Sequence, residues 1–435
     1  MTQFLTTNQV DFKTQFQALL SAKREDSPDV DAVVADIIAD VRKRGDAAVT
    51  ELTSKFDRLD LSSDKLVFTR EEIIGYCSTV PTAERDALEL AAERIRAYHA
   101  KQLPKDESWI DDAGVSLGWR WTPVSAAGLY VPGGLASYPS SVLMNAIPAK
   151  VAGVKRLAIC VPTPDGIINP LVLLAAQIAG VDEIYRIGGA QAIAALAYGT
   201  ETIAPVDKIT GPGNAFVAAA KRRVFGKVGI DMIAGPSEIL VIADSDNNPT
   251  WIATDLLAQA EHDESAQSIL ITDNEAFGHK VQAEVEQQLL TLPRRNIAGP
   301  SWRNFGAIIV VKSLKEAVEL SDRIAPEHLE LCVADPDELA AKITHAGAIF
   351  IGAWTPEAIG DYVGGPNHVL PTARSARFSS GLSVMDFLKR TTLTKMTPMA
   401  LAKIGPSAEI LANSEGLQAH GFSVRARLDK ITQPT

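Results

Sequence analysis

The chain has little cysteine, and its cysteines are not arranged to bind zinc or to form a disulfide framework. Only three occur among 435 residues, and Cys77, Cys160 and Cys332 each lie inside an apolar run far from the others. Isolated cysteines of this kind are typical of buried thiols in a reducing compartment. A zinc site in this chain would therefore use imidazole, carboxylate or amide ligands.

Long apolar runs and basic clusters are also missing. No apolar run reaches the ~20 residues that a membrane-spanning helix needs, and the N-terminus lacks a basic region followed by an apolar one. The formal net charge is -11, with no Lys/Arg cluster to offset it, which argues against nucleic acid or an anionic membrane as a partner. We expect a cytoplasmic protein that binds a small molecule, with no nucleic-acid and no membrane partner.

The composition, 46% hydrophobic and 22% charged, is that of an ordinary globular protein, and 435 residues are too many for one compact core. Short apolar strands alternate with helical segments, and this βαβ rhythm is typical of parallel sheets. It predicts an α/β fold of two doubly wound, Rossmann-like units with small N- and C-terminal helical extensions. Strands are expected at 156–161, 183–187, 208–210, 238–243, 268–272, 307–311, 329–333 and 348–351.

The domain organisation that we predict is discontinuous. Residues 1–25 form an N-terminal arm, and a first α/β domain combines 26–129 with 239–380. A second α/β domain covers 130–238, because the strand rhythm starts after a Pro132-Gly133-Gly134 turn and restarts after Ser237. Residues 381–435, where the strand signal fades into polar helices, form a C-terminal appendage or dimer arm.

Two glycine-containing turns each follow a short strand and open a helix, at 188–191 and 211–214. Backbone N–H groups and the helix dipole favour a phosphate at such a position. Neither turn matches the standard dinucleotide fingerprint, since the first lacks spaced glycines and the second has Phe216 where a third glycine would fall. They are either phosphate-binding loops or plain tight turns.

Scattered nitrogen and oxygen ligands suggest a metal site. Gln259 and His262 are three residues apart on an expected helix, so their side chains share one face. Asp361 and His420 add a carboxylate and an imidazole, a ligand set that suits zinc or a neighbouring divalent metal, although Gln is an uncommon ligand. Taken singly, His262 also fits a helix cap and His420 a surface residue. Spacing alone does not unite the four.

Glu327 and His328 place an acid beside an imidazole, a pairing suited to moving protons at neutral pH. Such a pair also arises at polar helix ends, but this one lies between a helix and an apolar strand, where α/β enzymes place active-site loops. A Gly-Gly-Pro-Asn turn precedes His368, and it either presents that imidazole or carries it incidentally.

Taken together, these motifs resemble histidinol dehydrogenases over nearly the whole chain. The motifs are Gly128-Leu129-Tyr130-Val131-Pro132-Gly133-Gly134, Gly188-Gly189-Ala190-Gln191, Gly211-Pro212-Gly213-Asn214, Asp231-Met232, Ala234-Gly235-Pro236-Ser237-Glu238, Gln259-Ala260-Glu261-His262, Pro326-Glu327-His328 and Asn367-His368-Val369-Leu370-Pro371-Thr372. So many motifs in order make a coincidence improbable.

The resemblance implies a zinc- and NAD-dependent enzyme that oxidises L-histidinol to L-histidinal and then to L-histidine, the last steps of histidine biosynthesis. It also implies a homodimer with shared active sites and one zinc per subunit. Carried over to this chain, the zinc ligands are Gln259, His262, Asp361 and the partner subunit's His420, and these would also contact the substrate. NAD would contact Tyr130, Gln191 and Asn214. The substrate would further contact Ser237, His328, His368 and the partner subunit's Glu415, with His328 as general base and Glu327 activating water.

Two other functions remain open. A relative on the same fold that oxidises another small alcohol, such as a sulfonated diol, would keep the zinc and NAD motifs and change the substrate pocket. Here His368 and Glu415 both fit the histidinol pattern. A non-enzymatic metal-binding protein would have lost the Glu327-His328 pair, which this chain retains.

Overall fold

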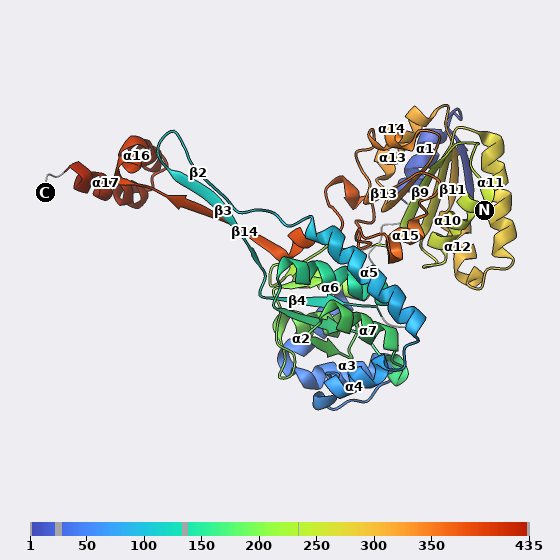
Figure 1. Ribbon diagram of the computed structural model, residues 1–435, viewed down its shortest axis with the longest axis horizontal. Coiled ribbons are helices and arrows are strands. Elements are labelled where there is room, and N and C mark those ends of the chain that lie inside the picture. Colours follow the sequence, from blue (N-terminus) through green and yellow to red (C-terminus); the bar gives the residue numbers. More distant parts are fainter. Residues whose placement is uncertain (1, 22–27, 133–137, 234, 433–435) are drawn as a thin grey trace. The chain divides into compact units, whose positions relative to one another are not determined.

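The computed structural model describes residues 2–21, 28–132, 138–233 and 235–432 (Figure 1). Gly133 and Gly134 of the predicted turn, and Ala234 of the 234–238 motif, lie outside the described residues. The chain forms two compact units. The first combines Met1–Gln102 with Ser125–Phe387, and the second combines Leu103–Val124 with Leu388–Thr435.

A six-stranded parallel sheet organises one half of the first unit, in the spatial order β1-β11-β10-β9-β12-β13. From β9 onward this is the 3-2-1-4-5 order of a doubly wound sheet, with the order reversing between β9 and β12. The strands are β1 (Gln3–Thr6), β9 (Glu238–Ala243), β10 (Gln267–Thr272), β11 (Ala307–Val310), β12 (His328–Cys332) and β13 (Ala348–Ile351).

Helices cover both faces of this sheet. Leu240 and Ile242 of β9 pack in one apolar cluster with residues of α1, α13 and α14, whereas Ile239 and Val241 pack in another with residues of α10, α11 and α12. Burial on both faces explains why the strand reads as a continuous apolar run. The helices are α1 (Phe12–Ser21), α10 (Pro249–Ala260), α11 (Glu275–Leu289), α12 (Arg295–Phe305), α13 (Leu314–Ile324), α14 (Pro336–Ala340) and α15 (Glu357–Tyr362).

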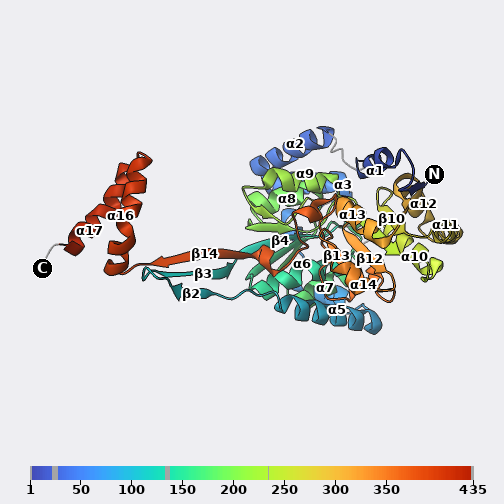
Figure 2. The ribbon, with the colours of Figure 1, turned by 90° about the horizontal axis from the view of Figure 1, so that it is seen from above.

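A five-stranded parallel sheet organises the other half, in the order β6-β5-β4-β7-β8, again a 3-2-1-4-5 arrangement. Helices α2, α3, α8 and α9 lie on one side of it, and α5, α6 and α7 lie on the other (Figure 2). The elements are α2 (Pro28–Arg44), α3 (Asp46–Asp57), α4 (Arg70–Cys77), α5 (Thr82–Ala100), β4 (Ala126–Tyr130), α6 (Pro139–Ala152), β5 (Arg156–Cys160), α7 (Pro170–Ala179), β6 (Glu183–Tyr185), α8 (Gly189–Tyr198), β7 (Lys208–Thr210), α9 (Ala215–Val224) and β8 (Gly229–Ile230). Short 3-10 helices occupy Ser63–Lys65, Pro164–Gly166, Ser375–Arg377 and Val384–Phe387.

The predicted fold class is confirmed: parallel sheets flanked by helices form two doubly wound halves. Each of the eight predicted strands is present, with ends within two residues of the expected ones. These strands are recognisable in the sequence because both helix layers bury their continuous apolar runs.

The N-terminal helices pack in a different half of the first unit from the one we expected. Helices α2 to α5 pack against α6 to α9 of the five-stranded half, although we expected residues 26–129 to join the six-stranded half. The N-terminal arm contributes β1, an edge strand parallel to β11, as well as a helix. An apolar stripe on a helix fits either sheet equally well, so sequence periodicity did not distinguish the two halves.

The second unit consists of a three-stranded antiparallel sheet and a helical hairpin. The sheet has the order β14-β3-β2, and α16 packs against α17. We expected only helices after residue 380, but β14 pairs with β3 over eight residues. Its side chains are almost all exposed, so it lacks the buried face that makes a strand recognisable in sequence. The elements are β2 (Glu107–Ile110), β3 (Ser116–Pro123), β14 (Leu388–Lys395), α16 (Pro398–Ser414) and α17 (Gln418–Thr432).

The three cysteines are buried free thiols, as predicted. Burial, the largest cause, raises the pKa of Cys332 to about 12, which keeps it protonated and unreactive at neutral pH. Among the helices of the described ranges, none is long and apolar enough to cross a membrane.

Candidate active site

The acid–imidazole pair lies at the amino end of the central strands of the six-stranded sheet. Glu327 directly precedes β12, whose first residue is His328, and the neighbouring strand β9 begins at Glu238. The Glu238 N–H donates to Glu327 Oε2 (2.9 Å), and the Glu238 carbonyl accepts from His328 Nδ1 (2.9 Å). One residue of β9 therefore fixes both side chains. Ser237, just before it, is half-buried.

His328 is held in the state that a general base requires. A carbonyl oxygen can only accept, so Nδ1 carries the hydrogen and Nε2 keeps its lone pair. Burial lowers the pKa of His328 to about 4, against the opposing charge of Asp361. The imidazole is therefore neutral at physiological pH. Its Nε2 is buried, makes no hydrogen bond to the described residues, and lies 3.5 Å from Glu357 Oε1.

Helix α10 brings Gln259 and His262 to this end of the sheet. The helix begins at Pro249, with the Asn248 side chain capping Thr250 N–H, and ends at Ala260, so His262 lies in the turn that follows. Gln259 is 1% exposed, and neither its amide oxygen nor its amide nitrogen has a hydrogen-bond partner in the part of the chain that the structure describes. Buried amides are normally satisfied, so this one marks a place for a ligand.

Helix α15 supplies the carboxylates. His262 Nε2 lies 3.9 Å from Asp361 Oδ2, which brings together two of the four predicted metal ligands. Gln259 lies in the last turn of α10, three residues before His262. One ligand atom each of His328, Glu357 and Asp361 also lies within 4.8 Å of the others, close enough to hold a metal ion.

Glu357 was missed by our reasoning from the sequence. It is buried at the start of α15, one helical turn before Asp361, and its carboxyl is hydrogen-bonded to that of Asp361. Two signals were present: the spacing of four residues from Asp361, which puts both on one helix face, and a Pro356-Glu357 pair that echoes Pro326-Glu327.

The two carboxyls of α15 have opposite pKa shifts. Burial, followed by the charges of Asp361 and Glu330, raises the pKa of Glu357 to about 10. Burial acts in the same sense on Asp361, but the hydrogen bond from His368 and the nearby imidazoles outweigh it and hold that pKa well below its usual value. Asp361 is thus the carboxylate of the pair and Glu357 the neutral acid.

His368 faces the same group of side chains. Its Nδ1 donates to the Asp361 carbonyl (3.1 Å), and its Nε2 lies 3.3 Å from Ser141 Oγ of α6. The preceding Asn367 is buried, donates to the Met144 carbonyl (2.6 Å) and accepts from Val369 N–H (2.9 Å). These bonds orient the turn, so it presents His368 and does not merely contain it.

The remaining two predicted contacts belong to the second unit. Glu415 follows the last residue of α16, and His420 lies in the first turn of α17. Both side chains are exposed.

The predicted NAD contacts lie at the carboxyl ends of the five-stranded sheet. Tyr130 ends β4, and its hydroxyl accepts from the Gly189 N–H (3.1 Å) at the start of α8. Gln191 is buried in the first turn of that helix. Asn214 caps α9, accepting from the N–H groups of Phe216 (3.1 Å) and Val217 (3.2 Å). The strand order reverses between β4 and β7, which is where doubly wound sheets bind ligands.

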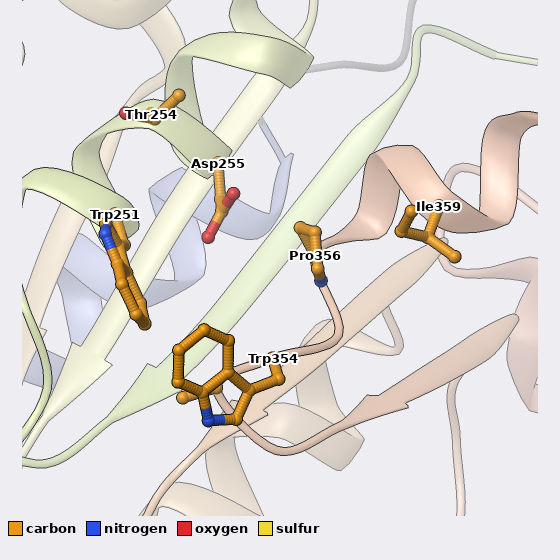
Figure 3. A pocket seen from close by; sticks show the side chains of 7 residues that line it. Trp251, Thr254, Asp255, Trp354, Pro356 and Ile359 are labelled. Atoms are coloured by element: carbon orange, nitrogen blue, oxygen red, sulfur yellow. The ribbon is translucent and has the colours of Figure 1, made fainter.

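A pocket of about 420 Å³ shares α10 and α15 with the metal-ligand group (Figure 3). The indoles of Trp251 and Trp354, which both line it, meet edge to face, and Asp255 lines it one helical turn before Gln259. Asp255 is hydrogen-bonded to Glu330, which shares a face of β12 with His328. Burial, the largest cause for both, raises the pKa of Asp255 to about 6 and that of Glu330 well above its ordinary value.

Fold and site together define a class of protein. Two doubly wound halves place phosphate-favouring turns on one sheet and, on the other, a neutral buried imidazole within a group of side chains that could hold a metal ion. A neutral proton acceptor on one half and phosphate-favouring turns on the other suit a nucleotide-dependent dehydrogenase.

Comparison with known proteins agrees with this class. The model of the family "Histidinol dehydrogenase" matches residues 20–428. The chain is 76% identical over 431 residues to a histidinol dehydrogenase of Ruegeria pomeroyi, covering 99% of this chain and 100% of the relative. It is 72% identical to one of Cereibacter sphaeroides, with complete coverage of both. A crystal structure of histidinol dehydrogenase from Elizabethkingia anophelis matches with a TM-score of 0.94 at 37% identity, over 99% of each chain.

The chain therefore belongs to the histidinol dehydrogenase family. This confirms the predicted family and the predicted class, an NAD-dependent dehydrogenase of histidine biosynthesis that carries out a four-electron oxidation.

Proposed function

We propose that the chain oxidises L-histidinol to L-histidinal and then to L-histidine in one active site, with one zinc per subunit and two NAD consumed per histidine formed. The observation that carries this proposal is the buried His328, whose unpaired Nε2 stands beside the Gln259, His262 and Asp361 group. A neutral base next to metal ligands suits the removal of a hydroxyl proton from a metal-oriented alcohol.

The residues present fit a zinc ion. Two ligands of one tetrahedral zinc stand about 3.4 Å apart when both bonds are near 2.1 Å, and the His262–Asp361 distance of 3.9 Å is close to that. The buried Gln259 amide has no partner among the described side chains, and a metal would give its oxygen one. Imidazole, carboxylate and amide ligands without thiolate suit zinc. The ligands in this proposal are Gln259, His262, Asp361 and the partner subunit's His420.

Zinc, when bound, would act as a Lewis acid that orients the substrate, and NAD would be the hydride acceptor. In the first oxidation, His328 Nε2 takes the proton of the substrate hydroxyl. The Glu238 carbonyl holds the Nδ1 hydrogen throughout, so the ring keeps one orientation and one tautomer. The low pKa of His328 ensures that Nε2 is unprotonated before each turnover.

Glu327 would activate the water that adds to the aldehyde carbon before the second oxidation. The Glu238 N–H fixes its Oε2, and this oxygen lies 3.7 Å from His328 Nδ1, so Glu238 holds the acid and the base side by side. The aldehyde is reactive, and completing both oxidations without release protects it.

Substrate recognition would use Ser237, His328, His368 and the partner subunit's Glu415, together with the zinc ligands. The hydrogen bond from His368 Nδ1 to the Asp361 carbonyl fixes the orientation of the His368 ring. Tyr130, Gln191 and Asn214 would contact NAD. The exposed positions of His420 and Glu415 leave them available to a partner subunit, which supports a homodimer with shared sites.

The proposal is tested by chelating the metal and returning it. NADH formation from L-histidinol should be lost after chelation and dialysis, and restored by adding zinc. If turnover is unaffected by the loss of bound metal, or zinc restores none of it, the proposal is wrong.

A further inference from the structure

A buried ion pair lies beside the NAD-contact turn of the five-stranded half. Lys221 Nζ in α9 pairs with Asp231 Oδ1, which follows β8, and the two side chains are 2% and 1% exposed. Lys221 Nζ also donates to the Gly211 carbonyl (2.9 Å), and the Gly211 N–H donates to Asp231 Oδ2 (2.8 Å). Both polar backbone groups of Gly211 are therefore held by one ion pair.

Gly211 needs such support because its backbone is in an unusual position. Its φ is +112°, and a Cβ there would lie 2.1 Å from the Tyr130 carbonyl oxygen. The chain thus leaves β7 pressed against the end of β4, in a conformation that only glycine adopts. The turn then runs through Pro212 and Gly213 to Asn214, which caps α9. The ion pair fixes one end of this turn, and the cap fixes the other.

Stability alone does not account for this arrangement. The free energy lost when two charges leave water is about as large as the attraction that a buried pair gains. Apolar residues of similar size often stabilise a fold equally well at such positions. The pair is not itself an anion site either, because its two charges cancel. Besides pairing with each other, the Lys221 and Asp231 side chains each form a hydrogen bond with the Gly211 backbone. What they determine is the shape of the 211–214 turn.

We propose that Lys221 and Asp231 are positioning residues that set NAD affinity by holding Gly211–Asn214 in the conformation that receives the dinucleotide. Neither residue touches NAD. The inference rests on the proposed function, because that proposal places NAD against Asn214. It predicts a defect in cofactor binding that spares the zinc site and histidinol.

The test is binding of NADH to the metal-free dimer, followed by NADH fluorescence, with KM for NAD and for histidinol measured on the zinc enzyme. Lys221→Met removes one charged hydrogen bond to the turn and should weaken NADH binding about tenfold or more. KM for NAD should rise in parallel, while kcat at saturating NAD, KM for histidinol and zinc content stay near wild type.

Two variants separate positioning from general damage. The double variant Lys221→Gln with Asp231→Asn keeps an uncharged donor and acceptor for Gly211, and should recover most of the lost NADH affinity. Arg156→Met is the matched control. It breaks an ion pair with Glu183 and bonds to the Pro205 and Ala204 carbonyls at the amino end of the same sheet, and should leave NADH affinity unchanged.

Asn214→Ala separates a failure of the positioning role from a failure of the proposed cofactor site. If Asn214→Ala weakens NADH binding and a folded Lys221→Met does not, the positioning role is wrong and the cofactor site stands. If Asn214→Ala has no effect, the proposed cofactor site itself fails. Equal losses in Lys221→Met and Arg156→Met, or no recovery in the double variant, would also overturn the positioning role.

Discussion

Replacing Gln259 by Leu should have opposite effects on the metal-free and the zinc-loaded protein. The Gln259 amide is buried, with neither polar atom satisfied by the described residues. An unsatisfied buried polar group costs about 1–3 kcal/mol, and Leu has similar volume and helix propensity. The metal-free variant should therefore be more stable by about 1–3 kcal/mol. At roughly 2–4 °C per kcal/mol for a domain of 150–250 residues, its Tm rises by several degrees.

In zinc, the wild type should become the more stable of the two proteins. At a zinc concentration of about 100 times Kd, binding stabilises the wild type by about 2.7 kcal/mol, whereas the variant has lost a ligand and should show a much smaller shift. The assay is thermal unfolding in chelator and in graded zinc, at one protein concentration.

Gln267→Leu is the matched control for Gln259→Leu. Gln267 is also a buried glutamine of the six-stranded half, but its Nε2 donates to the Phe305 carbonyl (3.2 Å). Its replacement should lower the metal-free Tm and leave the zinc shift intact. A Gln259→Leu protein that behaves like this control, with a lower metal-free Tm and an unchanged response to zinc, would contradict the prediction.

Four further predictions concern His328, Glu327, the shared zinc ligands and Asp255. His328→Asn should lose at least about 100-fold in turnover, the usual contribution of a general base, and far less in histidinol affinity by calorimetry; turnover near the wild-type value would contradict it. Glu327→Gln should slow NADH formation from histidinal more than from histidinol, and equal slowing would count against a role in water activation. Mixed dimers of His262→Asn and His420→Asn chains should recover activity that neither parent has, and no recovery would argue against a shared zinc. Burial raises the pKa of Asp255 from 3.8 to about 6, so the folded state binds more protons than the unfolded state between these values, and stability falls as pH rises through them. Asp255→Asn should make this fall shallower, while the buried Glu330 and Glu357 still contribute to it, and a wild-type Tm that drops no further than the variant's between pH ~4 and ~8 would contradict the sign.

Local spacing accounts for what the sequence predicted well. Gln259 lies in the last turn of α10 and His262 in the turn that follows, where its N–H donates to the Gln259 carbonyl (3.2 Å), so local spacing keeps the two residues adjacent. The central strands were found because burial on both faces leaves continuous apolar runs, as in Glu238–Ala243.

What the sequence did not predict depends on contacts between distant segments. The approach of His262 to Asp361 joins α10 to α15 across many intervening elements, and only the fold sets its distance. Glu357 was overlooked because an acid at a helix start usually serves the helix dipole, and its burial beside β12, where its N–H donates to Glu330 Oε1, depends on the fold. The exposed strand β14 carries no apolar alternation, so it read as part of a polar helical tail.

The most direct measurement is the ratio of NADH formed to L-histidinol consumed when histidinol is limiting and NAD is in excess, with the product identified by chromatography. The zinc-loaded protein should form two NADH for each histidinol and release histidine without free aldehyde. One NADH for each histidinol with accumulated histidinal, or no NADH at all, would contradict the four-electron oxidation in a single site.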